Sequence, residues 1–151
     1  MAKSFLCSVS RAHPENWTLA RDLGLWGVPG RVRSNRPRVE AGDLLYIWVG
    51  GVGYTASAKC IGPARAPLND DEAPWVGGRQ RYRFVVPFEV IVELRPPVFL
   101  GFDDEQRQRA TRLFKGNFQK GFFWMSRPAA GVLEEMFAEP DKYRRELEES
   151  T

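Results

Sequence analysis

The chain has 151 residues, which matches one domain and is long enough to bury a sizeable core. Its formal net charge is +3 and its pI about 9.1, so the composition allows a polyanionic partner without demanding one. No apolar run approaches the roughly 18 residues of a membrane span, and the N-terminus lacks a signal-peptide core. We therefore expect no membrane partner and a cytoplasmic protein.

Hydrophobic periodicity and turn residues predict a mixed α/β domain. A helix is expected from Pro14 to near Gly24, a second from 103 to 116, and a third after the capping residue Ser126. Strands are expected at 5–9, 44–49, 54–61, 82–94 and 121–125. The fold class is then a small, strongly bent sheet or β-barrel flanked by helices over 1–138, with a charged C-terminal tail or short helix over 139–151.

The residue patterns also predict which faces are buried. The segment 44–49 is apolar on both faces and should be covered on both sides. The segment 82–94 alternates, so Tyr82, Phe88 and Val90 should face the core, and Pro87 indicates a bulge or a sheet edge. Small residues of 54–61 opposite large aromatic residues predict a cleft. One stripe of the first helix should face the core, formed by Trp17, Ala20 and Leu23.

An aromatic pocket is predicted from the placement of an amide and two indoles. Asn16 stands at a helix start, Trp26 just past that helix, and Trp75 in a loop between acidic residues and paired glycines. Two facing indoles suit a flat, uncharged ring such as a base. Structural alternatives stay open, because Trp26 and Trp48 can be core residues and Asn16 can bond local backbone. Trp48 can also form the pocket floor.

Two arginine-rich stretches border this pocket in the sequence. The stretch 31–38 has the composition of an exposed, extended loop, and the second stretch follows Trp75. Guanidinium groups match phosphate oxygens bidentately, so these side chains are expected to hold a nucleic-acid backbone without reading its sequence. The alternative is an ordinary solvated loop. The residues concerned are Arg31, Arg33, Arg36, Arg38, Arg79 and Arg81.

Residues typical of catalysis or metal binding are sparse. His13 has no neighbouring cysteine or carboxylate at metal-ligand spacing, and the carboxylates at 70–72 are expected to solvate their loop. Cys7 and Cys60 form no CxxC pair and are interpreted as small buried residues in a reducing compartment. We expect no catalytic residues, no metal and no cofactor.

The order of elements resembles the YTH and EVE families of the PUA-like superfold, whose small barrels read modified bases. The resemblance covers roughly residues 4–137. It is carried by Pro14-Glu15-Asn16 leading to Gly24-Leu25-Trp26, by the hairpin Leu44 to Val49 with Gly53 to Ala58, by Ala73-Pro74-Trp75, and by the lead-in Val39 to Asp43, which is similar to the turn of EVE proteins.

This resemblance implies that Trp26 and Trp75 flank an extruded methylated base and that Asn16 hydrogen-bonds its edge. The hairpin residues Trp48, Tyr54 and Ser57 would line the rest of the pocket. The base is N6-methyladenine in YTH relatives and includes modified cytosine in EVE relatives. Because 62–79 contains a single tryptophan, a third wall must come from elsewhere, with Leu68 and Pro74 as candidates.

The sequence thus predicts a non-catalytic module that binds DNA or RNA through a flipped, modified base. The alternative is an ASCH-like RNA-processing enzyme or nuclease that uses Lys59, Asp43 or Tyr54 in the same cleft. A third alternative is a small-molecule or protein-interaction module. Whether a separately encoded nuclease is a partner, and whether the protein is an oligomer, stays open.

Overall fold

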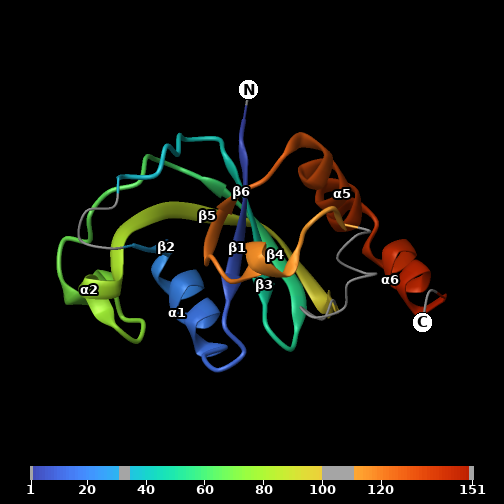
Figure 1. Cartoon of the computed structure of the whole chain (residues 1–151), viewed down its shortest axis with the longest axis horizontal. Coiled ribbons are helices and arrows are strands. Elements are labelled where there is room, and N and C mark those ends of the chain that lie inside the picture. Colours follow the sequence, from blue (N-terminus) through green and yellow to red (C-terminus); the bar gives the residue numbers. More distant parts are fainter. Residues whose placement is uncertain (1, 31–34, 100–110, 150–151) are drawn as a thin grey trace.

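A computed structural model describes residues 2–30, 35–99 and 111–149, with the elements arranged as in Figure 1. The strands are β1 (Ser4–Val9), β2 (Leu25–Pro29), β3 (Leu44–Val49), β4 (Gly53–Cys60), β5 (Tyr82–Val98) and β6 (Phe122–Trp124). The helices are α1 (Glu15–Leu23), the 3-10 helix η1 (Asp70–Glu72), α2 (Gly78–Arg81), α4 (Lys115–Phe118), α5 (Arg127–Ala138) and α6 (Pro140–Glu149).

The strands form one six-stranded sheet in the order β2-β5-β4-β3-β1-β6. Strands β1 and β3 are parallel, and the other neighbours are antiparallel. The sheet curls until its two edges approach each other. A hydrogen bond connects them, in which the Trp26 indole Nε1 donates to the carbonyl of Gly121, just before β6, at 3.2 Å. A Cβ added to Gly121 would lie 2.9 Å from Pro29 at the end of β2. The predicted fold class, a mixed α/β domain with a small bent sheet flanked by helices, is confirmed.

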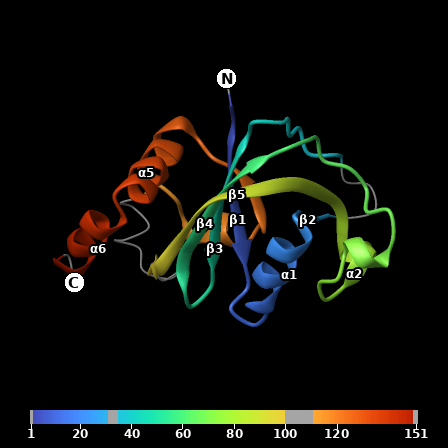
Figure 2. The same ribbon diagram turned by 180° about the vertical axis from the view of Figure 1, so that it is seen from behind.

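Strand β5 is longer than predicted and arches over α1 and β2 (Figures 1 and 2). The alternation expected along it fails at Val85, which is buried in the core and bridges to Arg65 through the backbone, and at Val90, which is exposed. Register shifts against β4 accompany this bend. Pro87 lies at neither an edge nor a bulge but pairs with Leu25. The ladder continues there because the Pro87 carbonyl accepts from Ile61 N and the next amide, Phe88 N, donates to Gly24 O.

Helix α1 ends where the sequence predicts. Gly24 adopts φ +73°, a left-handed conformation that glycine reaches without a steric cost, and its amide donates to Ala20 O. Trp17 and Ala20 are buried as expected, whereas Leu23 is exposed at 38%. The following five residues form β2, which sequence analysis missed.

Two hydrophobic clusters lie on opposite faces of the curled sheet. Successive strand residues point to opposite faces, so Cys7 and Ile47 belong to the inner cluster, whereas Leu6 and Tyr46 belong to the outer cluster. Strand β3 is therefore covered on both sides, as predicted. Helix α1 packs into the inner cluster through Trp17. The outer cluster contains the buried residues of α5, namely Ala129, Leu133, Met136 and Phe137.

The C-terminal elements agree with the sequence in part. Ser126 caps α5, with its hydroxyl accepting from Ala129 N at 3.4 Å. The charged segment after it forms α6. Most of the helix expected over 103–116 lies outside the described residues. None of the helices that the structure describes combines the length and the apolar character that a membrane crossing requires.

Candidate functional site

A cavity of about 640 Å³ opens between α1, β2, the loop at 75 and the end of β1, and its volume is in the range of small-molecule sites. It brings together several of the predicted pocket residues, which come from α1, β2, β3 and that loop. These are Asn16, Trp26, Trp48 and Trp75.

The two predicted indoles are held by backbone hydrogen bonds at the wall of this cavity. Trp26 Nε1 donates to Gly121 O at 3.2 Å, and Trp75 Nε1 donates to Asn16 O at 3.3 Å. Gly27 permits the close approach of Trp75 to β2, because a Cβ there would lie 2.7 Å from the indole ring. Both indoles are 4% exposed and belong to the inner cluster, so they are core residues that also line the cavity. The core interpretation of Trp26 and its pocket interpretation are thus compatible.

Asn16 has incomplete hydrogen bonding in this wall. Its backbone carbonyl accepts from Trp75 and its amide N–H donates to His13 O. The side-chain oxygen Oδ1 is buried and has no hydrogen-bond partner among the described residues. A buried polar atom without a partner costs about 1–3 kcal/mol. The Asn16 side chain does not cap α1, and its Oδ1 is left without a partner in the cavity wall.

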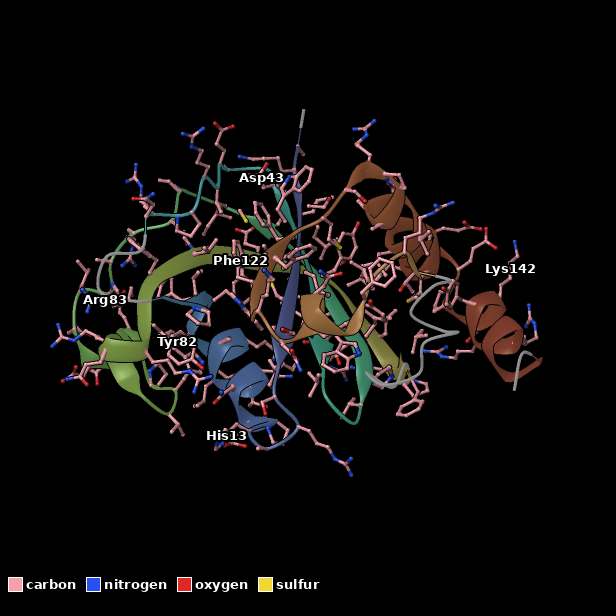
Figure 3. All side chains as sticks on the ribbon, in the orientation of Figure 1. His13, Asp43, Tyr82, Arg83, Phe122 and Lys142 are labelled. Carbon is pink, nitrogen blue, oxygen red and sulfur yellow. The ribbon has the colours of Figure 1, made fainter. Side chains whose placement is uncertain are left out.

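Tyr82 forms a third aromatic part of the cavity wall, whereas the candidates expected from the sequence were Leu68 and Pro74. Its ring centroid lies 5.1 Å from that of Trp75, and Figure 3 shows it between α2 and α1. Neither Leu68 nor Pro74 lines the cavity. The alternation along 82–94 predicts that Tyr82 faces the core. It does not indicate that the same side chain also lines a cavity.

Ion pairs fix the loop that carries Trp75. Arg65 Nη1 and Nη2 donate to the two carboxylate oxygens of Glu72 at 2.7 and 3.0 Å, and Leu68 N donates to Glu72 Oε1 at 2.8 Å. The hydrogen bond from Arg65 is the main cause that lowers the pKa of Glu72 to about 2. Arg79 pairs with Asp70 at 2.8 Å. Two of these acidic residues therefore order the loop, and no group of metal-ligating side chains occurs within the described ranges.

Tyr54 and Ser57, predicted to line the pocket, lie outside it. Tyr54 is fully buried in the outer cluster, 6.5 Å from Phe118 and 6.4 Å from Phe137 between ring centroids, and burial raises its pKa far above the usual range. Ser57 is buried where β4 pairs with Tyr46 of β3 and Val92 of β5. The hairpin pattern could not show which of its residues the sheet would bury away from the cavity.

The residues of the alternative enzyme also lie outside the cavity. Asp43 is buried and accepts from Lys3 N and Glu40 N, both at 2.9 Å, which orders the start of β3. Figure 3 shows Asp43 at the opposite end of the molecule from His13, which lines the cavity. Lys59 stands near one end of β4 and Tyr54 near the other. The three side chains are not brought together at one site.

The charged residues that line the cavity are basic. Arg11, Arg81 and Lys120 contribute to the lining, together with His13, and no carboxylate occurs among the described lining residues. Arg81 also stands over the Tyr82 ring, with its guanidinium carbon 5.6 Å from the centroid. The sequence did not point to Arg11 and Lys120, because neither lies in an arginine-rich stretch.

The other predicted arginines are placed differently. Arg36 and Arg38 are exposed and do not line the cavity, and Arg79 is engaged by Asp70. Arg31 and Arg33 lie outside the described residues. Of the six, Arg81 alone is a lining residue within the part of the chain that the structure describes.

Comparison with known proteins supports the fold alone. No protein-family model and no curated protein matches the chain. A hypothetical protein from Leishmania major is similar in structure, with a TM-score of 0.60 and 12% identity over 93% of this chain and 97% of that chain. Proteins from Pseudomonas putida and Pseudomonas syringae match with TM-scores of 0.53 at 14% and 13% identity, over 88% of this chain and 98% of each of theirs.

Proposed function

We propose that the protein is a non-catalytic module that binds a nucleic acid by taking one modified base into the cavity. The observation that carries this proposal is the combination of Trp26, Trp75 and the incompletely bonded Asn16 in one cavity whose charged lining residues are basic. We propose N6-methyladenine or a modified cytosine as the base, and DNA and RNA as alternative strands.

The aromatic side chains account for the flat shape of the ligand. A base has a π-face, and stacking on an aromatic side chain contributes about 1–3 kcal/mol per base. A methyl group adds apolar area that indole edges and the Tyr82 ring can cover without desolvating a charge. Because the indole N–H groups of Trp26 and Trp75 are already bonded to carbonyls, the edge of the base is left to Asn16.

The Asn16 amide accounts for recognition of that edge. An amide both donates and accepts, so it can read a ring nitrogen or an exocyclic amine. The unbonded Oδ1 means that a ligand bond to this side chain replaces no bond within the protein. Methylation of an exocyclic amine leaves one N–H, which is a donor that Oδ1 can accept after rotation of the amide.

Arg11, Arg81 and Lys120 account for the polyanionic strand. Extruding a base costs a few kcal/mol of unstacking, and contacts to the flanking phosphates offset that cost without specifying the sequence. We propose binding without chemistry, in which the aromatic walls hold the base and the basic side chains hold its strand. We further propose that the protein acts in the cytoplasm.

The test is binding to a panel of short single-stranded and duplex oligonucleotides. Each carries one N6-methyladenine, 5-methylcytosine or 5-hydroxymethylcytosine and is compared with its unmodified twin by titration at fixed salt. We expect one modification to bind at least several-fold tighter than its twin, with every strand recovered intact. Equal affinity for all twins would contradict base reading, and cleaved strands would favour an enzyme.

Asn16→Ala supplies the matched variant. It should weaken binding to the preferred strand by about 1–3 kcal/mol, because the edge of the bound base loses its partner. Asn69→Ala is the control, since Asn69 caps η1 through Glu72 N and does not line the cavity. If both variants bind as the unaltered protein does, Asn16 does not read the base.

A further inference from the structure

The cavity is lined by two groups of aromatic side chains. The inner group is Trp26, Trp75 and Tyr82, which all belong to the inner cluster. The outer group is Trp48, Phe99 and Phe118. Trp48 and Phe118 belong to the outer cluster, with their ring centroids 4.7 Å apart. The proposed base reading by Trp26, Trp75 and Asn16 uses the inner group and leaves the outer group without a role.

The two groups are close along the wall that connects them. Phe118 packs on Trp48 of the outer group, and Gly121 accepts from Trp26 of the inner group. Three residues of chain span at most about 10 Å. Two neighbouring nucleotides of an extended strand cover such a distance, so one strand can reach both groups.

Phe99 gives the outer group an accessible aromatic face. Its side chain is 52% exposed, although it lines the cavity with the buried Trp48 and Phe118. The close packing of the hairpin against the end of β5 fixes its position. A Cβ added to Gly53, which has φ +106°, would lie 2.1 Å from Val98 O and 2.7 Å from Phe99 Cα. An exposed aromatic ring beside a basic groove is the arrangement that stacks single-stranded bases.

Arg11 lies beside the outer group. A Cβ added to Gly50 would lie 2.7 Å from Arg11 N, and one added to Gly51 would lie 3.5 Å from Arg11 Nε, so the glycine turn seats this side chain against the hairpin. Lys120 lines the cavity between Phe118 and Gly121. Both cations therefore line the cavity that holds the two aromatic groups, where a strand occupying both groups would place its connecting phosphate.

We propose that the outer group is a second subsite, which stacks the base adjacent to the modified base on Phe99 while Arg11 contacts the phosphate between the two nucleotides. The inference rests on the proposed function, and it adds that the ligand is single-stranded on at least one side of the modified base. Affinity then depends on the neighbouring base through stacking, with weak sequence preference.

The experiment is a cycle between the protein and the strand. The full strand has five nucleotides and carries the preferred modified base at its centre. Two further strands are identical except for an abasic site, placed on the 5′ side of the modified base in one and on the 3′ side in the other. For the unaltered protein, one of the two abasic strands should bind about 5- to 150-fold more weakly than the full strand, the range that corresponds to one stacked base. The other abasic strand should bind nearly as well as the full one.

The Phe99→Ala variant should bind the full strand only as weakly as the unaltered protein binds the weaker abasic strand. The variant should also bind the full strand and that abasic strand with equal affinity. Phe99→Leu keeps apolar volume without the aromatic face and decides the matter if the alanine variant is unfolded. Trp124→Ala is the control, because Trp124 is 56% exposed but does not line the cavity. It should preserve the abasic penalty.

Two failures are distinguishable. An abasic penalty that persists in both Phe99 variants, or is missing on both sides in the unaltered protein, overturns the second subsite even where modified and unmodified twins still differ. Loss of discrimination between twins, with the Phe99-dependent penalty intact, overturns base reading by the inner group and supports the second subsite. No binding to any strand overturns both.

Discussion

The inner and outer clusters are built from similar residues but differ in what covers them. Trp26 and Trp75 of the inner cluster border the cavity, with their indole N–H groups bonded to carbonyls of its wall. Tyr54 of the outer cluster packs with Phe137 of α5 and is sealed. Aromatic residues of one sheet are thus placed differently, because Trp26 and Trp75 border the cavity whereas Tyr54 is sealed against α5. The two regions should respond alike to lost volume and differently to conservative changes.

The largest expected effect is loss of stability, and it should be similar in both regions. Trp26→Ala and Tyr54→Ala should each lower the free energy of unfolding by about 3–5 kcal/mol, because each leaves a large cavity in a packed cluster. Chemical denaturation measures this loss. Trp124→Ala, at an exposed position, should change it by about 0.5 kcal/mol or less. A small loss at Trp26 alone would mean that the inner cluster does not support the fold.

A conservative pair should separate the regions. Trp75→Phe keeps an aromatic ring in the inner cluster but removes indole area and the N–H bond to Asn16 O. We expect it to weaken binding to the modified strand by about 1–2 kcal/mol and to reduce the ratio between modified and unmodified twins. Tyr54→Phe, in the outer cluster, should leave that ratio unchanged. Titration of both variants at one salt concentration is the measurement, and an equal response would erase the distinction.

The basic residues that line the cavity should contribute equally to the affinity for modified and unmodified twins. Replacing Arg11 and Lys120 by alanine removes the two proposed phosphate contacts, which should flatten the plot of log affinity against log salt by about 1.4 on single strands. The ratio between twins should survive, because phosphate contacts carry no base information. The double variant Arg36→Ala with Arg38→Ala is matched in charge but lies outside the cavity lining. A larger change in slope from this pair would place the strand along the 31–38 stretch instead.

The smallest expected effect concerns the loop that brings Trp75 to the inner cluster. The pKa of Glu72 is about 2 in the folded chain, below the usual value near 4.3 in an unfolded one. Its ionised form therefore stabilises the fold above about pH 4, and this contribution is lost as the pH falls through about 2. Glu72→Gln should lower the free energy of unfolding by up to about 1 kcal/mol at pH 7, with the difference shrinking toward pH 2.

Asp71→Asn is the control for this pH dependence, because Asp71 is an exposed carboxylate of the same loop. Unfolding midpoints of both variants should be measured from pH 7 to pH 2. If Glu72→Gln and Asp71→Asn follow the same curve, the Arg65 pair does not stabilise the loop.

Local signals explain the elements that were found and the one that was missed. Pro14 and Gly24 bound α1, Ser126 caps α5, and Gly50 to Gly53 form the turn between β3 and β4, all readable from neighbouring residues. Strand β2 was missed because its five residues include a glycine and end in a proline, a composition typical of loops. Pairing with β5 overrides that local preference, and only long-range contacts provide it.

The sequence by itself determined the fold class and indicated Asn16, Trp26 and Trp75 as pocket residues, since an amide at a helix start and indoles beside glycines are local patterns. Only the tertiary structure decided that Tyr82, Phe99, Arg11 and Lys120 join them while Tyr54 and Ser57 do not. The physical reason is the curl of the sheet: it brings the ends of β2 and β6 together around a cavity, and it leaves the opposite face to α5. Which face a strand residue presents follows from its period of two, but which face is sealed follows from packing.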